Sequence, residues 1–82
     1  MYLEGLVSNV VETFTFTQVY STILIINDND GIMDMDFLEV YDGNDNMIFK
    51  LRPQEYVALN KYFEIIKIKA NPNQSYFRIM VI

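Results

Sequence analysis

Hydrophobic and polar positions alternate along most of this chain with the two-residue period of β-strands. The main exception is a run of four aliphatic residues, Ile23 to Ile26, which the turn-forming sequence Asn27–Gly31 follows. A strand points successive side chains to opposite faces, so Ile23 and Ile25 share one apolar face while Leu24 and Ile26 share the other. A strand that is apolar on both faces is typical of the centre of a sheet. We therefore predict a central strand here.

Six further segments carry strand patterns separated by turn-forming residues. The loop 42–46, Asp-Gly-Asn-Asp-Asn, predicts a hairpin between the two segments beside it. One segment behind Pro53 also has hydrophobic residues at helical spacing, so a short helix stays open there beside the favoured strand. Lysines alternate with isoleucines in another segment, which is typical of an edge strand. The six segments are Val10–Thr17, Phe37–Tyr41, Met47–Leu51, Gln54–Tyr62, Phe63–Lys69 and Ser75–Ile82.

Seven candidate strands at a spacing of roughly ten residues indicate an all-β protein. We expect one small antiparallel β-sandwich or jelly-roll-like barrel that spans residues 1–82. The weakly patterned residues 1–8 are expected to be a lead that is mobile, or that docks through Leu3, Leu6 and Val7 on a partner or on the chain's own core. A chain of this size without cysteine has no disulfide to support a marginal core, so oligomerisation is the expected source of extra stability.

Charge divides the chain into two unlike parts. Residues 1–49 carry nine acids and no base, whereas residues 50–82 carry six bases and two acids. Two interpretations remain open: strands from the two parts pair within one domain, or the acidic face of one subunit meets the basic face of the next in a ring. Six dispersed bases in an acidic chain make no phosphate track, so we expect no nucleic-acid partner. The longest apolar run has four residues and no basic signal sequence opens the chain, so we expect no membrane partner or secretory leader.

The acidic turn after the central strand is the one visible candidate for a metal site. Calcium prefers oxygen ligands, and four aspartates here are weak candidates. The spacing does not fit an EF-hand, because with Gly31 at the sixth loop position the first and twelfth positions are Ile26 and Phe37. An Asn/Asp/Gly turn with an acidic rim is the preferred interpretation, and we expect no cofactor. The four candidates are Asp28, Asp30, Asp34 and Asp36.

Catalytic chemistry finds little support in the sequence. The chain has no histidine or cysteine, and it contains no nucleophile elbow or phosphate-binding glycine loop. The carboxylates of Asp34 and Asp36 are two residues apart, but an exposed turn does not raise the pKa of a glycosidase acid. We therefore expect a protein that is not an enzyme.

Binding is the remaining class of function, and six tyrosines exceed what a small core needs. In the first hypothesis, tyrosines and the doubly apolar strand pack against other copies or another protein. In the second, two or three aromatic rings form a shallow sugar-stacking face of a carbohydrate-binding module. The residues expected at an interface are Ile23, Leu24, Ile25, Ile26, Tyr41, Tyr56, Tyr62 and Tyr76.

The order of these segments resembles that of small virion accessory proteins of tailed bacteriophages. The resemblance covers residues 13–82 and runs from a Thr/Phe strand through the Ile-rich strand that ends at Asn27. It continues through the sequence Asn-Met-Ile-Phe-Lys-Leu-Arg-Pro-Gln-Glu of residues 46–55, with Gln54 where such loops often have glycine. It closes with an Ile/Lys strand, residues 65–70, and an aromatic-Arg strand, residues 75–79.

The resemblance implies a structural role in a virion. Such proteins look like β-sandwich or jelly-roll modules that trimerise or form rings, and they decorate capsids or build head fibres and tail parts. We therefore expect a homo-oligomer that binds other virion proteins, such as the coat or tail protein. It would be made in the host cytoplasm and would end in the virion. A small carbohydrate- or protein-binding module is the alternative.

Overall fold

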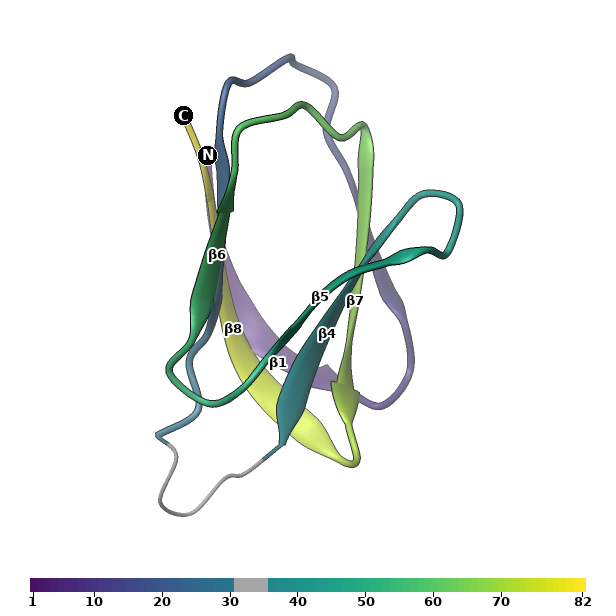
Figure 1. The fold of residues 1–82 in the computed structure, drawn as a ribbon, viewed down its shortest axis with the longest axis vertical. Coiled ribbons are helices and arrows are strands. Elements are labelled where there is room, and N and C mark those ends of the chain that lie inside the picture. The colour runs from purple at the N-terminus through teal and green to yellow at the C-terminus, as the bar shows by residue number, and fades with distance from the viewer. Residues whose placement is uncertain (31–35) are drawn as a thin grey trace.

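The chain folds into two four-stranded antiparallel sheets that face each other, as Figure 1 shows. The computed structural model describes residues 1–30 and 36–82. Sheet A has the strand order β1-β8-β3-β6, and sheet B has the order β2-β7-β4-β5. The predicted all-β sandwich is confirmed. The strands are β1 (Tyr2–Ser8), β2 (Glu12–Thr15), β3 (Ile23–Asn27), β4 (Phe37–Asp42), β5 (Met47–Leu51), β6 (Tyr56–Leu59), β7 (Ile65–Asn71) and β8 (Gln74–Val81).

The strand order is that of a jelly roll. Strand β1 pairs with β8, β2 with β7, β3 with β6 and β4 with β5, so the chain forms one long antiparallel ribbon that reverses between β4 and β5. Two further pairings, β3 with β8 and β4 with β7, close this ribbon into two sheets. Each strand from the acidic part of the chain therefore lies beside strands from the basic part.

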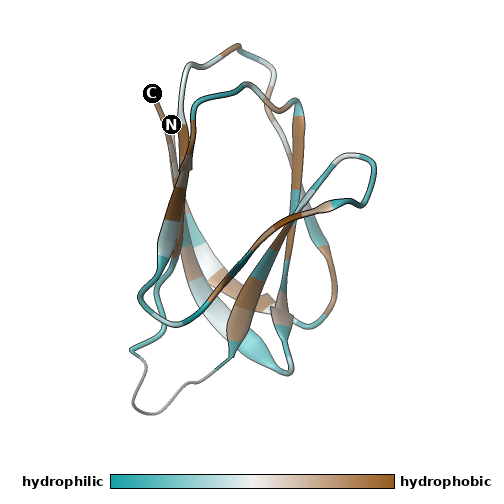
Figure 2. Ribbon diagram, in the orientation of Figure 1, coloured by the Kyte–Doolittle hydropathy of each residue, from teal (hydrophilic) through white to brown (hydrophobic). Residues whose placement is uncertain are grey.

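The core lies between the inner faces of the two sheets. Strand β3 is an interior strand of sheet A, which confirms the predicted central strand. Its residues Ile23 and Ile25 are fully buried, whereas Leu24 and Ile26 are half-buried on the opposite face. Hydrophobic residues follow the strands and hydrophilic ones gather in the connecting loops (Figure 2). In the described part of the chain, the other fully buried aliphatic side chains are Val7, Leu38, Val40, Leu51, Ile66, Ile68, Ala70 and Ile79.

Two strands differ from the sequence predictions. Residues 1–8 were expected to be a lead, but residues 2–8 form β1, a strand in addition to the seven predicted, at one edge of sheet A. Strand β7 was expected at an edge because of its lysines, and that prediction is wrong, since β7 lies between β2 and β4. Its lysines do not protect an edge, because Lys67 and Lys69 project from the outer face of sheet B toward acidic partners.

The remaining local predictions agree with the structure. The strand alternative is correct for the segment behind Pro53, which forms β6. Strands β4 and β5 form the predicted hairpin, with a bulge between Val40 and Tyr41. Gln54 has a φ of 69°, which is the left-handed conformation that glycine adopts most easily. Its side chain donates to the backbone carbonyl of Asn29, so an interaction that glycine cannot make holds Gln54 in this conformation.

A buried amide joins the two sheets at one end of the sandwich. The side-chain nitrogen of Asn27 donates to the backbone oxygens of Asp36 (3.1 Å) and Leu51 (3.0 Å). Its side-chain oxygen accepts from the backbone of Asn29 and from the hydroxyl of Ser75, each at 3.1 Å. These four bonds satisfy the donors and acceptor of a buried amide, so they offset the cost of removing the group from water.

The face assignment of β3 leads to a stability prediction. Ile25→Ala removes a fully buried side chain and should lower the free energy of unfolding by about 3 kcal/mol. Leu24→Ala, which truncates the neighbouring side chain on the outer face, should lower it by about 1 kcal/mol. Denaturant unfolding followed by circular dichroism measures both values. Equal losses would contradict the inward orientation of Ile25.

Candidate functional site

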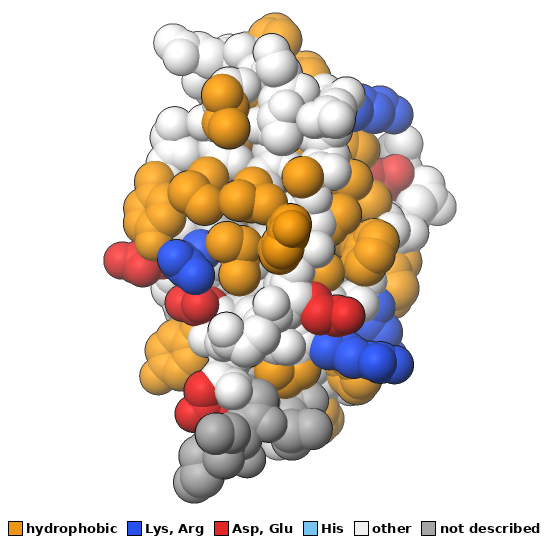
Figure 3. Space-filling model, turned by 60° about the vertical axis from the view of Figure 1, so that its left-hand side comes forward, with side chains coloured by type: hydrophobic (Ala, Val, Ile, Leu, Met, Phe, Trp, Pro, Cys, Tyr) orange, Lys and Arg blue, Asp and Glu red, His pale blue; other side chains and the backbone are white. Residues whose placement is uncertain are grey.

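The outer face of sheet A is apolar across all four strands. Side chains that lie opposite one another in the ladders form a row of Tyr2, Met80, Leu24 and Ala58. This row exists because the buried residues of each strand point inward, which leaves their neighbours on the outer face. Figure 3 brings this side of the molecule forward and shows hydrophobic side chains gathered across it, with acidic and basic groups beside them.

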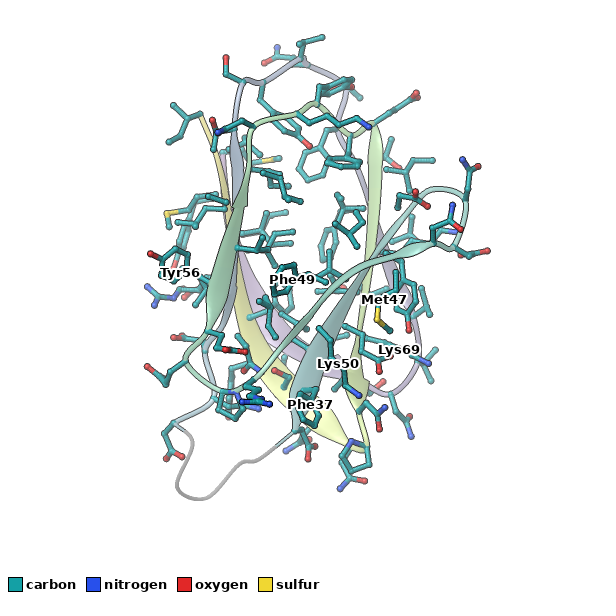
Figure 4. The ribbon with its side chains drawn as sticks, in the orientation of Figure 1. Phe37, Met47, Phe49, Lys50, Tyr56 and Lys69 are labelled. Atoms are coloured by element: carbon teal, nitrogen blue, oxygen red, sulfur yellow. The ribbon has the colours of Figure 1, made fainter. Side chains whose placement is uncertain are left out.

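Two aromatic residues extend this row along the sheet. The next row contains Glu4, Arg78, Ile26 and Tyr56, and beyond it Leu6 lies opposite Tyr76. Tyr56 is 67% exposed and Tyr76 is 50% exposed. Figure 4 shows Tyr56 pointing away from β6 and from the core.

The two charged side chains on this face, Glu4 and Arg78, each interact with a nearby side chain of the same chain. Arg78 Nη2 lies 3.0 Å from Asp28 Oδ1. The hydroxyl of Tyr2 donates to Glu4 Oε2 at 3.0 Å. Glu4 and Arg78 are opposite each other in the β1–β8 ladder, so the face carries an acid and a base side by side.

The size of the outer face of sheet A is in the range of binding surfaces. Four strands about 4.8 Å apart, each contributing about six residues, cover roughly 400 Å². Apolar patches of about this size on soluble proteins are often functional. Most of the large side chains on this face are hydrophobic, so the face can bind by burying apolar surface, with the acid and base giving orientation.

The outer face of sheet B is different because it is charged. Glu39 lies at its centre and is 5% exposed. Lys69 and Lys50 are its cross-strand neighbours on β7 and β5, with nitrogens 3.7 Å and 4.0 Å from the carboxylate. The carboxylate also accepts hydrogen bonds from the Tyr41 hydroxyl (2.6 Å) and from the Asn71 amide (3.0 Å).

These contacts change two pKa values. Burial alone would raise the pKa of Glu39, but the hydrogen bonds from Asn71 and Tyr41 and the charges of the two lysines outweigh it, so this pKa is lower than usual. The hydrogen bond to Glu39, with burial and the charge of Glu39 adding to it, raises the pKa of Tyr41 to about 12. At neutral pH the cluster therefore holds an ionised carboxylate and a neutral phenol.

The lysines of this face also contact aromatic rings. Lys50 Nζ lies 4.5 Å from the centre of the Phe37 ring, and Figure 4 shows the two side chains near the same end of β4. Lys69 Nζ lies 5.9 Å from the centre of the Tyr41 ring. Each base is thus occupied by partners within the chain, which leaves the outer face of sheet B less suited to a new partner than the outer face of sheet A.

The ion pairs explain the uneven charge of the sequence. Each of the four in the described part of the chain joins an acid from residues 1–49 to a base from residues 50–82. The interpretation that the two parts pair within one domain is therefore confirmed. Sequence reasoning did not find the Glu39 cluster, because only the register places this residue between two lysines.

The structure brings together half of the residues predicted at an interface. Leu24, Ile26, Tyr56 and Tyr76 share the outer face of sheet A. Ile23 and Ile25 are fully buried in the core, so they lie on no surface.

The other two predicted tyrosines lie elsewhere. Tyr41 belongs to the Glu39 cluster on sheet B. Tyr62 donates to the backbone oxygen of Phe16 at 2.7 Å. Its ring meets that of Tyr20 edge-on at a centroid distance of 5.0 Å, so it packs at one end of the sandwich.

Four hydrophobic members of the outer face of sheet A were not among the residues predicted at an interface: Tyr2, Leu6, Ala58 and Met80. Tyr2 and Leu6 lie in β1, where Gly5 interrupts the alternation and hides the strand pattern. Met80 was assigned to the correct strand face, but its neighbours across the sheet depend on a register that the sequence does not show.

The acidic turn shows no metal site in its described part. Asp28 pairs with Arg78, and Asp36 accepts hydrogen bonds from the backbone nitrogens of Asn73 (3.0 Å) and Gln74 (2.7 Å). Asp30 also has an interaction within the chain. Asp34 lies outside the described residues. Within residues 1–30 and 36–82, no three acidic, histidine or cysteine side chains are placed to hold a metal ion.

A hollow of about 310 Å³ lies at the end of the sandwich near both termini. Its polar side chains are hydroxyls and one amide, from Thr15, Thr17, Tyr20 and Gln18. The Tyr20 hydroxyl is engaged with the backbone of Phe63, at 3.1 Å to its oxygen and 2.9 Å to its nitrogen. No lysine, arginine, aspartate or glutamate is among the residues that line this hollow.

The lowered pKa of Glu39 predicts how stability depends on pH. The folded state holds the ionised carboxylate more strongly than the unfolded chain does, so the contribution is present above the ordinary pKa of 4.5 and is lost as pH falls through the lower folded-state pKa. Glu39→Gln should lower the free energy of unfolding by about 2 kcal/mol at neutral pH. Denaturant unfolding across a pH series should show this difference shrinking below pH 4.5.

Asp45→Asn is the matched control, because Asp45 pairs with Lys67 on the same sheet but its side chain is 76% exposed. This change should alter stability by less than about 0.5 kcal/mol. A Glu39→Gln difference that stays constant into the acid range would show that packing, and not charge, is what Glu39 contributes.

Among the described residues, no helix is long and hydrophobic enough to cross a membrane. No model of a known protein family matches this sequence, and no curated protein shows significant similarity to it.

Proposed function

We propose that this chain is a non-enzymatic structural module that assembles with copies of itself through the outer face of sheet A. The observation that carries the proposal is the row of Tyr2, Met80, Leu24 and Ala58, which makes this face apolar across its full width. Removing such a face from water is favourable, and two sheets pack well at a separation of about 10 Å.

The charges of the face support a second copy as the occupant. Glu4 and Arg78 lie side by side, so a copy turned about a two-fold axis brings its Arg78 toward Glu4 and its Glu4 toward the existing Arg78–Asp28 pair. A partner whose charge has a single sign would satisfy one of these groups and oppose the other. The face is thus complementary to itself.

The size of the face supports assembly into a larger particle. Two faces of roughly 400 Å² bury about 800 Å² in total, whereas stable pairwise interfaces bury about 1,200–2,000 Å². One such contact is therefore weak alone. A two-fold contact closes a pair of copies, so a larger particle needs a second contact on the same subunit. Two contacts of this kind strengthen each other through effective concentration, which suits a subunit that works in many copies.

A virion is the assembly that we propose for this module. The segment order resembles virion accessory proteins of tailed phages, and jelly rolls are common in viral capsid proteins. The second point is an analogy of fold, since a fold alone does not define a function. On this proposal the remaining partners are coat or tail proteins, and the module reaches the virion from the host cytoplasm.

A carbohydrate-binding module is the second candidate function. The observation that favours it is the exposure of three tyrosines on the outer face of sheet A, with Tyr2 at 49%, Tyr56 at 67% and Tyr76 at 50%. Aromatic rings offer flat apolar surfaces on which a sugar can stack. Such a module works as a monomer with its rings in water, whereas the assembly proposal buries the same rings between copies.

Light scattering after size exclusion tests the proposal. The wild-type protein should have a mass well above the 9.7 kDa of one chain. Leu24→Lys places a charge in the apolar row and should lower the assembled mass, with the contact weakened at least about tenfold. Thr15→Lys, on the outer face of sheet B, is the control and should leave the mass unchanged.

A wild-type mass of one chain at every concentration would overturn the assembly proposal. Tyrosine fluorescence measured against a glycan panel then tests the second candidate. A sugar-dependent change that Tyr56→Ala abolishes would establish carbohydrate binding on this face.

A further inference from the structure

The four edge strands of the sandwich are not equally protected. Strands β2 and β6 have four residues each, and β5 carries Lys50 and pairs with β4 through a bulge. Short length, lysine and bulges are the usual devices that keep an edge from pairing with another chain. Strand β1 has seven residues, and Glu4 is its one charged side chain, with no lysine, arginine or proline. It is therefore the least protected of these edges.

The hydrogen bonds of β1 show which of its backbone groups face this free edge. Met1 and Val81 exchange backbone bonds, with Val81 N donating to Met1 O at 3.0 Å and Met1 N to Val81 O at 3.5 Å. Bonded and non-bonded pairs alternate in an antiparallel ladder, so Leu3, Gly5 and Val7 bond to β8. The N–H and C=O groups of the remaining residues, Tyr2, Glu4, Leu6 and Ser8, point away from the sheet.

We propose that the free edge of β1 pairs antiparallel with β1 of a second copy of this chain. This inference rests on the proposed self-assembly and specifies a second contact for it. Four residues with outward backbone groups can form a ladder with their symmetry mates. That ladder supplies the affinity that the outer face of sheet A lacks alone.

The charge of Glu4 and the positions of the free backbone groups of β1 favour one register, with the two-fold axis at Gly5. In this register Tyr2 lies opposite Ser8 of the second copy, and Glu4 lies opposite its Leu6. All four residues whose backbone groups point to the free edge then form hydrogen-bonded pairs. A shift of the axis to Glu4 would place two carboxylates directly opposite each other, which is destabilising. A shift to Leu6 would leave Tyr2 without a partner.

Gly5 is suited to the centre of such a contact. At a non-bonded antiparallel pair the Cα atoms approach to about 4.5 Å, and glycine in a strand interior often marks the close approach of another backbone. Within the chain, a Cβ at Gly5 would lie 3.4 Å from the Phe77 ring, which is an ordinary contact. The fold of a single copy therefore does not itself require glycine here.

Edge pairing joins two copies of sheet A into one eight-stranded sheet. The side chains of a bonded antiparallel pair lie on the same side, so the two outer faces become one continuous and mostly apolar surface of roughly 800 Å². Two such pairs that stack face to face bury about 1,600 Å², which is the size of a standard stable interface. We therefore expect the wild-type assembly to contain four chains or a multiple of the edge-paired dimer.

Proline at position 4 tests the edge contact. Glu4→Pro removes an N–H that points to the free edge and leaves the bonds to β8 in place, whereas Glu4→Ala removes the same side chain and keeps the N–H. By symmetry the change removes two intermolecular bonds, so it should weaken edge pairing at least about tenfold while Glu4→Ala does not. Light scattering gives the masses, and circular dichroism checks that both variants are folded.

Comparison with Leu24→Lys separates this inference from the proposed function. The expected result is that the Leu24→Lys variant remains an edge-paired dimer. The Glu4→Pro variant should no longer form the edge contact. If Glu4→Pro has the mass of Glu4→Ala while Leu24→Lys dissociates, the edge inference fails and the face contact stands. If Glu4→Pro dissociates while Leu24→Lys has the wild-type mass, the edge contact stands and the face proposal fails.

A single cysteine tests the register independently. The chain has no cysteine of its own, and a residue on the two-fold axis lies within disulfide distance of its mate. Gly5→Cys should therefore form disulfide dimers under mild oxidation. Ser8→Cys is the control, because its mate lies about 20 Å away in this register. Equal cross-linking of the two variants, or none for Gly5→Cys, would overturn the register.

Discussion

The packing of Ile23 and Ile25 between the two sheets is the contact on which the other features of this structure depend. Because these residues face inward, the alternation of a strand places Leu24 and Ile26 on the opposite side. The pairing of β3 with β8 and β6 then determines which side chains of those strands face inward and which face outward. One buried pair of side chains thus defines both a core and an apolar outer face.

The long antiparallel ribbon gives the uneven charges a structural role. It places strands from the acidic part of the chain beside antiparallel strands from the basic part, so acids meet bases across the ladders. Glu39 illustrates the result, because it lies between Lys50 and Lys69 and is buried with its charge balanced. The outer face of sheet B therefore satisfies its own charges, while the outer face of sheet A keeps hydrophobic groups in water.

These two faces lead to a consistent view of function. A surface whose charges are paired internally has little left to offer a partner, whereas an apolar face gains stability when it is covered. Strand β1 adds outward backbone groups beside that face, and unpaired backbone groups also gain when another strand satisfies them. Both features lie on sheet A, so the proposed contacts of this module are concentrated on one side of the sandwich.

The sequence by itself determined the all-β class, the central strand and the hairpin after Tyr41, because alternation and turn residues are local signals. Only the tertiary structure decided which face of that strand is buried, since both of its faces are apolar. It also decided that β7 is an interior strand and that residues 2–8 form β1. The neighbours of β1 and β7 cannot be predicted from Gly5 or from the lysines of β7. Strand order and register depend on pairing between distant parts of the chain.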